Sequence, residues 1–393
     1  MGTSWLLRGQ NDLTTATRVE GALVKMGMQN IHVVEHDRRL LVTYENLRYR
    51  FGPVGMGAVL KAMDTLPVSG VDTVTLLVRY RNLPVLAVHA PRWALHGGFP
   101  KVASSAIQAD WKVEKWEHLM GKHSIINSSF FRLDIPIGPG LRYQLGNFDH
   151  PIRAAVDVQI GLDMTLGPGL SVQGLVAVPV YNNLDDKKNI HLERFSVVYD
   201  RFFQDQSSIS LSGGFFTLNR VGVHAAGRKW FVDERFSLRF DAGITGFSNI
   251  GGPVRFKEQE RGWFPVYLLG AEYWWPRYSM CVRLTGGRFL YQDEGVTLDV
   301  FRQMGEFRMG FFVTRTTIES NMGFNLSVPL LPRCYGKQYR VRIRTADQFP
   351  FVYRFRGNGR DARRYGVGTN LVDQVYGFYP NYSVQEMWEA LDH

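Results

Sequence analysis

Cysteine is nearly absent from this sequence, which has only Cys281 and Cys334 among its 393 residues. Protein zinc sites use closely spaced pairs of cysteine and histidine, and neither cysteine belongs to such a pair. Two cysteines also cannot build a disulfide framework, so folding does not require an oxidising compartment. We therefore expect no metal site, and nothing in the composition implies another cofactor.

Long apolar runs are missing as well. The longest uncharged run, residues 164–184, is broken by Gly167-Pro168-Gly169 and by polar residues at positions 171, 173, 182 and 183. A transmembrane helix needs about 20 consecutive apolar residues, so none is expected. The first residues lack a basic segment followed by an apolar core. This is compatible with a cytosolic protein or with a leader that has been removed.

Recognisable catalytic motifs are also lacking. His96-Gly97-Gly98 resembles part of an oxyanion hole, but no Gly-x-Ser-x-Gly elbow accompanies it, so a loop turn is the simpler interpretation. The best strand-borne candidate for catalysis is His224, for which a hydrogen-bonding role is again simpler. The sequence therefore predicts a protein that is not an enzyme.

Glycine and aromatic residues are abundant, with 40 Gly, 26 Phe, 17 Tyr and 9 Trp. This combination is typical of many short strands and tight turns rather than of packed helices. Hydrophobic residues make up 45% and charged residues 21%, which excludes global disorder. Forty-six basic and 36 acidic residues give a formal net charge of +10, which would suit nucleic acid, lipid headgroups or an anionic glycan.

The first ninety residues combine helical and strand patterns. Apolar residues recur at helical spacing before Gly27, and a second helix is expected after Pro53. Four strands are expected, at residues 31–34, 40–44, 74–80 and 85–89. The order α-β-β-α-β-β predicts a small α+β domain over residues 1–90 with a binding or docking role. Residues 91–124 are expected to form a linker with one short helix.

From residue 125 onward, segment after segment alternates between apolar and polar residues with a period of two. In residues 236–245, Phe, Leu, Phe, Ala and Ile alternate with Ser, Arg, Asp, Gly and Thr. The connectors between such segments are short and turn-like. The pattern predicts an antiparallel up-and-down meander of about 12–16 strands.

Such a meander has two interpretations. In a soluble β protein the apolar faces form the core, whereas in an outer-membrane barrel they contact lipid and the polar faces line the lumen. Long strands, a polar face rich in Gly, Ser and Thr, and aromatic residues at strand ends all favour the barrel. We therefore expect a mainly β protein with an up-and-down transmembrane β-barrel at residues 125–350. A C-terminal tail with a short helix is expected at residues 351–393.

The sidedness of this barrel depends on how residues 125–146 fold. If they form one strand, both long connectors, 182–190 and 249–262, lie outside the cell and the N-terminal domain lies in the periplasm. If they form a hairpin, the two sides are exchanged. The sequence leaves both arrangements open.

Charged residues on the polar faces of the strands would point into the lumen. They could form a mutually neutralising lattice, or a polar conduit that contacts an anionic or hydroxylated polymer. The lumen candidates are Arg132, Arg153, Asp157, Asp163, Arg239, Asp241, Arg283 and Arg308.

Basic residues are concentrated after the last clear strands. Aromatic residues interleave with them, but no nucleic-acid-binding module is recognisable, so a polar cluster inside or under the barrel mouth is the preferred interpretation. This basic cluster contains Arg340, Arg342, Arg344, Arg354 and Arg356.

Residues 287–298, GRFLYQDEGVTL, follow the pattern G-R-ϕ-x-x-x-D-x-G-ϕ-T-ϕ. This stretch resembles a hairpin of the YjbH/GfcD family of exopolysaccharide-associated outer-membrane proteins. Residues 310–316, GFFVTRT, and 324–330, FNLSVPL, are similar to two of its strands. Residues 44–50, YENLRYR, are similar to a segment of its periplasmic α+β domain. The resemblance is most specific over residues 285–332.

The resemblance implies an outer-membrane β-barrel that serves capsule, slime or exopolysaccharide export in a Gram-negative bacterium. It implies a secreted polysaccharide, outer-membrane lipid and a periplasmic polysaccharide-export protein of the Wza type as partners, and it transfers no catalytic residue. The expected role is a porin-like conduit or an anchor for the polymer, with the N-terminal domain docking the export protein. Two alternatives stay open: a barrel enzyme acting on lipid or glycan, and a structural barrel that does not conduct.

Overall fold

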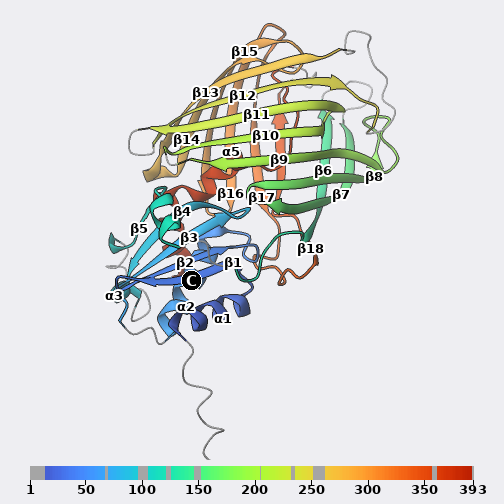
Figure 1. Ribbon diagram of the computed structural model, residues 1–393. Helices are drawn as coiled ribbons and strands as arrows, with labels where there is room; N and C mark the ends of the chain where they lie inside the picture. Colours follow the sequence, from blue (N-terminus) through green and yellow to red (C-terminus); the bar gives the residue numbers. More distant parts are fainter. Residues whose placement is uncertain are drawn as a thin grey trace, which may run out of the picture. The chain divides into compact units, whose positions relative to one another are not determined.

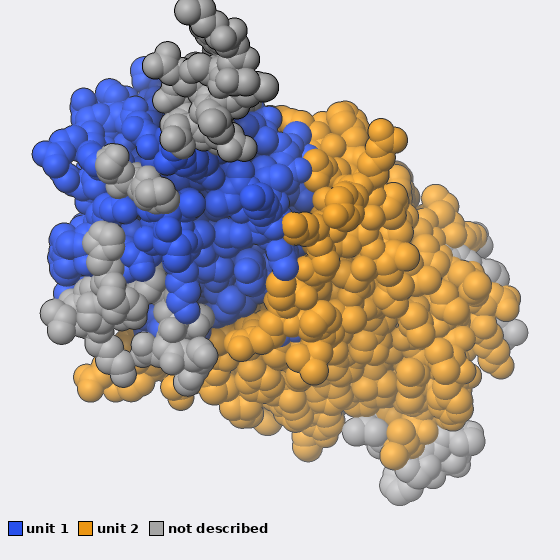
Figure 2. Space-filling model, turned by 90° about the horizontal axis from the view of Figure 1, so that it is seen from below, with its two compact units in different colours: residues 1–129, 377–393 blue, residues 130–376 orange. Residues whose placement is uncertain are grey.

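The structure is a computed structural model that describes residues 14–66, 70–95, 105–120, 125–145, 152–203, 205–231, 235–250, 262–355 and 361–391. The chain forms two compact units, one of residues 1–129 with 377–393 and one of residues 130–376 (Figure 2). The fold is mainly β, with 57% strand and 18% helix. Each unit has its own sheet and is described by itself.

The first unit contains a five-stranded sheet in the order β1-β2-β3-β4-β5 (Figure 1). Strands β2 and β3 are parallel and the other neighbours are antiparallel. The strands are β1 (Gln29–His36), β2 (Arg39–Glu45), β3 (Thr73–Tyr80), β4 (Leu83–Pro91) and β5 (Gln108–Asp110). The helices of this unit are α1 (Thr15–Met26), α2 (Gly52–Thr65), α3 (Arg92–Leu95), α4 (Glu114–Met120) and α6 (Pro380–Leu391). The α-β-β-α-β-β order predicted for the first ninety residues is confirmed.

Local sequence explains where α1 begins and ends. The Thr14 hydroxyl accepts a hydrogen bond from the backbone N–H of Thr17, which satisfies one of the free donors at the helix start. Gly27 ends the helix with φ +85°, a left-handed conformation that glycine adopts without steric cost. The predicted boundary at Gly27 is therefore confirmed.

Residues 91–124, for which the sequence predicts a linker, contribute α3, β5 and α4 to the first unit. Trp111 is fully buried there, and its indole N–H donates to the carbonyl of Phe378 at 2.9 Å. Helix α6 contacts α2 and β5 within the same unit. The C-terminal residues therefore complete the core of the first unit, far along the chain from its other elements.

The second unit is a fourteen-stranded sheet built as a meander from β6 to β17, with β18 and β19 at its edges. All neighbouring strands are antiparallel except β18 and β6, which are parallel. The predicted antiparallel meander is thus confirmed, and its strand number lies within the expected range. The strands are β6 (Leu133–Leu145), β7 (Ile152–Gly167), β8 (Leu170–Asn182), β9 (His191–Phe202), β10 (Ser207–Phe216), β11 (Arg220–Phe231), β12 (Phe236–Phe247), β13 (Phe264–Trp275), β14 (Met280–Arg288), β15 (Glu294–Met304), β16 (Phe307–Thr316), β17 (Ser320–Pro329), β18 (Val341–Thr345) and β19 (Gln348–Arg354).

The burial pattern of this sheet is the reverse of that in a soluble β protein. On β12, Leu238, Phe240 and Ile244 are 46%, 39% and 45% exposed. Polar residues alternate with them and are buried, with Ser237 at 0%, Asp241 at 7% and Thr245 at 0% exposed. The same inversion recurs along the meander, because side chains of a strand point alternately to its two faces. The outward face is therefore apolar and the buried face polar.

The two edges of the sheet are joined by consecutive residues of the chain. Strand β18 pairs with the first half of β6, and only residues 346 and 347 separate it from β19, which pairs with β17. The Tyr143 ring of β6 stacks on Phe351 of β19 at 5.3 Å between centroids, and its hydroxyl donates to the Val352 carbonyl at 3.1 Å. Among the described residues these contacts, rather than a continuous ladder, connect β6 and β19.

Glu45 is a buried carboxylate in the first unit, with 3% of its surface exposed. It accepts hydrogen bonds from the side-chain amide of Asn30, from the Ser129 hydroxyl at 3.1 Å and from the Arg81 backbone N–H at 2.5 Å. Burial raises the pKa of this carboxyl above its ordinary value, although the hydrogen bonds act in the opposite direction. Ionised Glu45 therefore opposes folding of this unit.

A carboxyl whose pKa is raised by folding stabilises the folded state while protonated, and this contribution is lost as the pH rises through the raised pKa. We therefore expect the backbone around Glu45 to be better protected at about pH 5 than at about pH 8, and Glu45→Gln to remove this difference. Hydrogen exchange of peptides containing Arg81, corrected for intrinsic exchange rates, measures it. The exposed Glu35→Gln is the control and should behave like wild type. Equal protection of the wild type at both pH values would contradict the expectation.

Candidate functional site

A C-terminal segment of the second unit, residues 361–376, lies against the buried face of the sheet. We call it the inner segment. It begins beside the β14–β15 turn, where the Ala362 N–H donates to the Asp293 carboxylate at 2.7 Å and the Leu290 N–H donates to the Arg363 carbonyl at 3.0 Å. The Gly366 N–H then donates to the Thr217 hydroxyl at 2.7 Å.

Apolar packing supports this first half of the inner segment. Ala362, Tyr365 and Val367 are buried in a cluster with residues of the sheet, and the Tyr365 ring stacks on Phe216 at 5.3 Å between centroids. The sheet contributes Phe216, Val266, Leu268, Phe289 and Leu290 to this cluster. The beginning of the inner segment is thus fixed by both hydrogen bonds and apolar contacts.

The second half of the inner segment makes polar contacts with the sheet, and its Leu371 and Val372 side chains are fully buried. The Gln173 side chain accepts from the backbone N–H and hydroxyl of Thr369 at 2.8 and 2.9 Å, and donates to the Thr369 carbonyl at 2.7 Å. The N–H of Leu371, the first residue of α5 (Leu371–Gln374), donates to the Asp200 carboxylate at 2.9 Å. Ser210 donates to the same carboxylate at 2.6 Å. Gln173 and Asp200 of the buried face therefore bind the main chain of the inner segment, and Ser210 supports Asp200.

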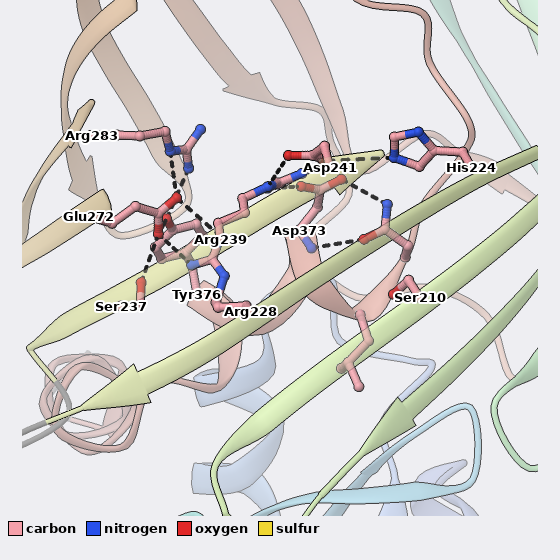
Figure 3. A network of polar contacts seen from close by, with 12 residues as sticks. Ser210, His224, Arg228, Ser237, Arg239, Asp241, Glu272, Arg283, Asp373 and Tyr376 are labelled. Carbon is pink, nitrogen blue, oxygen red and sulfur yellow. Dashed lines mark hydrogen bonds and ion pairs between the residues drawn. The ribbon is translucent and has the colours of Figure 1, made fainter. Parts of the chain in front are cut away.

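Arg239 joins the sheet to the inner segment by ion pairs (Figure 3). Its guanidinium donates to both oxygens of Asp241 at 2.8 Å and to Asp373 of the inner segment at 2.5 Å. On the other side of Asp241, His224 Nε2 lies 3.6 Å from the carboxylate, and His224 Nδ1 lies 3.1 Å from the Tyr365 hydroxyl. Two strands and two points of the inner segment thus share one charged network.

Glu272 on β13 is the centre of a second network. Arg228 donates to its two oxygens at 2.7 and 3.3 Å, and Arg283 Nε donates at 2.6 Å. The hydroxyl of Ser237 donates at 3.2 Å, and that of Tyr376 is also hydrogen bonded to the carboxylate (Figure 3). The Arg228 and Glu272 side chains are 0% and 1% exposed. Two arginines therefore neutralise one carboxylate away from solvent.

The structure brings some of the predicted lumen residues together. Arg239, Asp241 and Arg283 belong to the two networks, and the Arg308 guanidinium lies 5.8 Å from the Tyr376 ring. Glu272, Arg228, Tyr376 and Asp373 were not predicted. Glu272 and Arg228 lie on strands whose apolar and polar residues alternate, and both belong to the polar face. The period of two could therefore have indicated their orientation.

Other predicted lumen residues lie elsewhere on the sheet. Arg153 donates to the carbonyls of Asn183 and Leu184 at 3.1 and 2.8 Å in the β8–β9 connector, and Asp157 lies 3.5 Å from Arg142. Asp163 is opposite Asp134 in the ladder between β6 and β7. Arg132 donates to the carbonyl of Gln338 at 2.9 Å. They do not join the two networks at the inner segment.

The predicted basic cluster serves the edges of the sheet. Arg342 donates to both oxygens of Asp134 on β6 at 2.7 and 3.0 Å, and Arg344 Nε donates to one of them at 2.5 Å. Arg354 Nη1 lies 3.4 Å from the carboxylate of Asp361 in the inner segment. The side chain of Arg340 is exposed, and Arg356 lies outside the described residues. These ion pairs fix β18 to β6 and β19 to the inner segment.

The geometry around His224 is relevant to the enzymatic alternative. Ser212 lies opposite His224 in the ladder between β10 and β11, and Asp241 is close to the imidazole. However, the two ring nitrogens face Asp241 and Tyr365, so neither is directed at the Ser212 hydroxyl as a general base would be.

Within the described residues, no group of three or more His, Cys, Asp or Glu could hold a metal ion. Among the same described residues, no helix is long and apolar enough to cross a membrane.

Removing the carboxylate of Glu272 would leave the buried Arg228 and the partly buried Arg283 without the carboxylate that they share. We expect Glu272→Ala to lower the free energy of unfolding by about 3–5 kcal/mol, because breaking a buried pair leaves an uncompensated charge. Urea unfolding of the purified protein measures this loss. Asp205→Ala is the matched control, since its pair with Lys229 is 61% and 36% exposed, and it should cost less than about 1 kcal/mol. Equal losses in both variants would contradict a stabilising role of the Glu272 network.

The hairpin 287–298, on which the family resemblance depends, has a defined place in this site. Gly287 and Gly295 face each other across β14 and β15, where an added Cβ would lie 2.1 and 2.2 Å from a backbone oxygen of the next strand. Glycine is therefore required at both positions. The turn between them buries Phe289 and Leu290 and directs Asp293 to the inner segment. The motif thus forms the anchor of the inner segment.

Part of the chain matches a known protein family. The family model described as "Exopolysaccharide biosynthesis protein YbjH" matches residues 7–201, which include residues 7–129 of the first unit and the strands β6 to β8 with nearly all of β9. The hairpin at 287–298 lies beyond the matched residues, so its resemblance to the family stays a prediction. No curated protein and no solved structure matches the chain. On this match the chain belongs to the YjbH exopolysaccharide biosynthesis family.

Proposed function

We propose that the protein is an outer-membrane β-barrel component of an exopolysaccharide secretion system. The observation that carries this proposal is the inverted burial of the fourteen-stranded sheet, whose outward face exposes residues such as Leu269, Phe311 and Val223 at 73%, 61% and 58%. Water disfavours so continuous an apolar surface, whereas the hydrocarbon core of a membrane accommodates it. Family membership supplies the connection to exopolysaccharide biosynthesis.

The strand lengths and the edges of the sheet support a closed barrel. The strands of the meander have 9–16 residues, and a tilted strand needs about 9–11 residues to cross a bilayer. A membrane sheet must not leave unpaired edges in lipid, because unsatisfied backbone groups are costly there. Strands β18 and β19 meet this requirement if they act as one closing strand, with β18 on β6 and β19 on β17.

The connectors support a periplasmic location of the first unit. Residues 133–145 form the single strand β6, rather than one half of a hairpin. Strands β8 and β12, which the long connectors follow, then end at the end of the sheet opposite the start of β6, and β6 directly follows the first unit in the chain. Outer-membrane barrels place long loops outside and short turns in the periplasm.

The inner segment favours an anchor over an open conduit in the resting protein. It binds the buried faces of β8 to β14, which in a barrel would line the lumen. The resting role would then be to fix the secretion machinery in the outer membrane, with the first unit docking a periplasmic polysaccharide-export protein of the Wza type. This role requires no catalytic step.

Deletion of the gene for this protein in its source bacterium should strongly reduce surface polysaccharide, because the secretion system would lose its outer-membrane component. Re-expression of the intact chain should restore it. In the same strain the protein should require detergent for extraction from outer-membrane fractions. Unchanged surface polysaccharide after deletion, or a protein that is soluble without detergent, would refute the proposed function.

Closure of the sheet can be tested at Asp134, which pairs with Arg342 and Arg344 of the closing strand. We expect Asp134→Ala to lower the unfolding temperature of the barrel markedly, since it removes the carboxylate that Arg342 and Arg344 share and leaves only Asp347 to pair with Arg344. Heat-dependent mobility on detergent gels measures this. The control is Asp185→Ala, which removes a partner of Arg142 at a site where both side chains are 34% exposed. This variant should change the unfolding temperature little. An unchanged unfolding temperature in Asp134→Ala would contradict closure of the sheet by β18.

A further inference from the structure

Tyr376, the last residue of the inner segment, fills a pocket of the sheet that is made of aromatic and charged side chains. The ring centroids of Phe301, Trp274 and Trp230 lie 5.7, 5.9 and 6.4 Å from that of Tyr376. Trp230 and Trp274 are each only 2% exposed. The phenol ring therefore replaces solvent between three aromatic side chains.

The polar part of the pocket surrounds the hydroxyl of Tyr376. The hydroxyl is hydrogen bonded to Glu272 and accepts from Arg283 Nη2 at 2.9 Å, and the Arg228 guanidinium lies 4.5 Å from the ring centroid (Figure 3). We call this pocket the Tyr376 cage. It consists of Trp230, Trp274, Phe301, Arg228, Arg283 and Glu272.

The same set of groups suits a sugar ring. The C–H face of a pyranose packs on aromatic rings, and its hydroxyls donate to carboxylates and accept from guanidinium groups, as the phenol of Tyr376 does here. A carboxylate on the sugar would pair with the arginines. We propose that the Tyr376 cage is a binding subsite for one sugar unit of the polysaccharide, held shut by Tyr376 of the same chain. This inference rests on the proposed function.

Release of Tyr376 requires that the end of the inner segment can move. Residues 369–376, here called the arm, belong to no ladder of the fourteen-stranded sheet and are held by side-chain contacts from Gln173, Asp200 and Arg239. Water or sugar hydroxyls can replace such hydrogen bonds one at a time. The arm is therefore bound in a way that allows exchange.

Gly368 provides the point about which the arm can turn. Its φ is +117°, and an added Cβ would lie 2.6 Å from Gln173 Oε1, so this position requires glycine. Before it, Tyr365 and Val367 are fixed in the apolar cluster. After it, the arm combines the polar contacts described above with the buried side chains of Leu371, Val372 and Tyr376. Gly368 thus separates a base that is fixed in the apolar cluster from an arm that we propose can be released.

The arm continues directly into the first unit. The second unit ends at Tyr376, and from Gly377 the chain belongs to the first unit, where α6 contacts α2 and β5. A partner that binds the first unit and displaces α6 would therefore pull on the arm through the backbone. Docking of the export machinery and opening of the sugar subsite would then be coupled by a single stretch of chain.

The natural cysteine Cys281 reports on the cage. Its Sγ lies 4.0 Å from the Tyr376 hydroxyl, and the residue is 1% exposed. In the 393-residue chain carrying Cys334→Ser, Cys281 is the one remaining cysteine. We expect Tyr376→Ala to accelerate its reaction with a charged methanethiosulfonate reagent by about tenfold or more, because the cage becomes open to water. An unchanged rate would show that Tyr376 does not close the cage.

Ligand protection tests the sugar subsite itself. Oligosaccharides prepared by partial hydrolysis of the exopolysaccharide of the source bacterium should slow the reaction of Cys281 in the Tyr376→Ala variant. They should have no such effect on the slow reaction of the protein with Tyr376 in place. Fast modification without protection would overturn the subsite. Because the assay uses purified protein, this result would leave the secretion role of the chain intact.

Matched variants separate a specific opening from general loosening. Tyr365→Ala removes the other large ring of the inner segment, which packs on Phe216, and should leave Cys281 slow. Acceleration in both variants would overturn the specific role of Tyr376. Asp373→Asn weakens the pair with Arg239 while Tyr376 stays in place, and it should give an intermediate rate. If Cys281 reacts no faster in Asp373→Asn than in the protein with Asp373, the proposal of a releasable arm is overturned.

Folding of each variant is checked by heat-dependent gel mobility. If Tyr376→Ala does not fold, Tyr376→Phe keeps the ring and removes only the hydrogen bonds to Glu272 and Arg283. It should give a smaller acceleration that the same oligosaccharides reduce. If Cys281 reacts at the same rate in Tyr376→Phe as in the protein with Tyr376, the result would contradict the proposal.

Discussion

The second unit depends on one constraint: its polar side chains lie on the face that is shielded from water, so each charge there needs a partner. A buried guanidinium or carboxylate without a counter-charge is strongly destabilising. Arg228 on β11 meets this requirement with Glu272 on β13, Arg239 meets it with Asp241 on the same strand, β12, and Arg342 on β18 meets it with Asp134 on β6. The charged residues therefore act first as structural contacts, and their availability to a polymer is secondary.

The inner segment follows from the same constraint. The buried faces of the strands carry Ser196, Gln173 and Asp200, which in a wide barrel would be solvated, and the chain supplies main-chain and side-chain partners for them instead. The arm thus completes the polar surface that the sheet leaves open. Because the arm continues into the first unit, the buried face of the sheet and the first unit are connected by the backbone.

Local pattern determined much of what could be predicted from the sequence. The period of two depends only on neighbouring residues, so it located the strands and showed which face of each is apolar, as on β12. The positive φ of Gly27 and the glycine pair at 287 and 295 follow from steric limits that glycine alone avoids. Family motifs in the hairpin 287–298 and in residues 44–50 indicated exopolysaccharide biosynthesis, and the family is confirmed.

Only the tertiary structure determined which residues meet. Arg342 and Asp134 are separated by 208 positions, and Tyr376 lies 104 positions from Glu272, so no local period relates them. The sequence likewise did not show that residues 361–376 return to the buried face or that α6 completes the first unit. Such contacts depend on how strands β6 to β19 curve and where the last residues are then accommodated. The sequence by itself thus defined an amphipathic sheet and its family, whereas long-range pairing of buried charges determined the site.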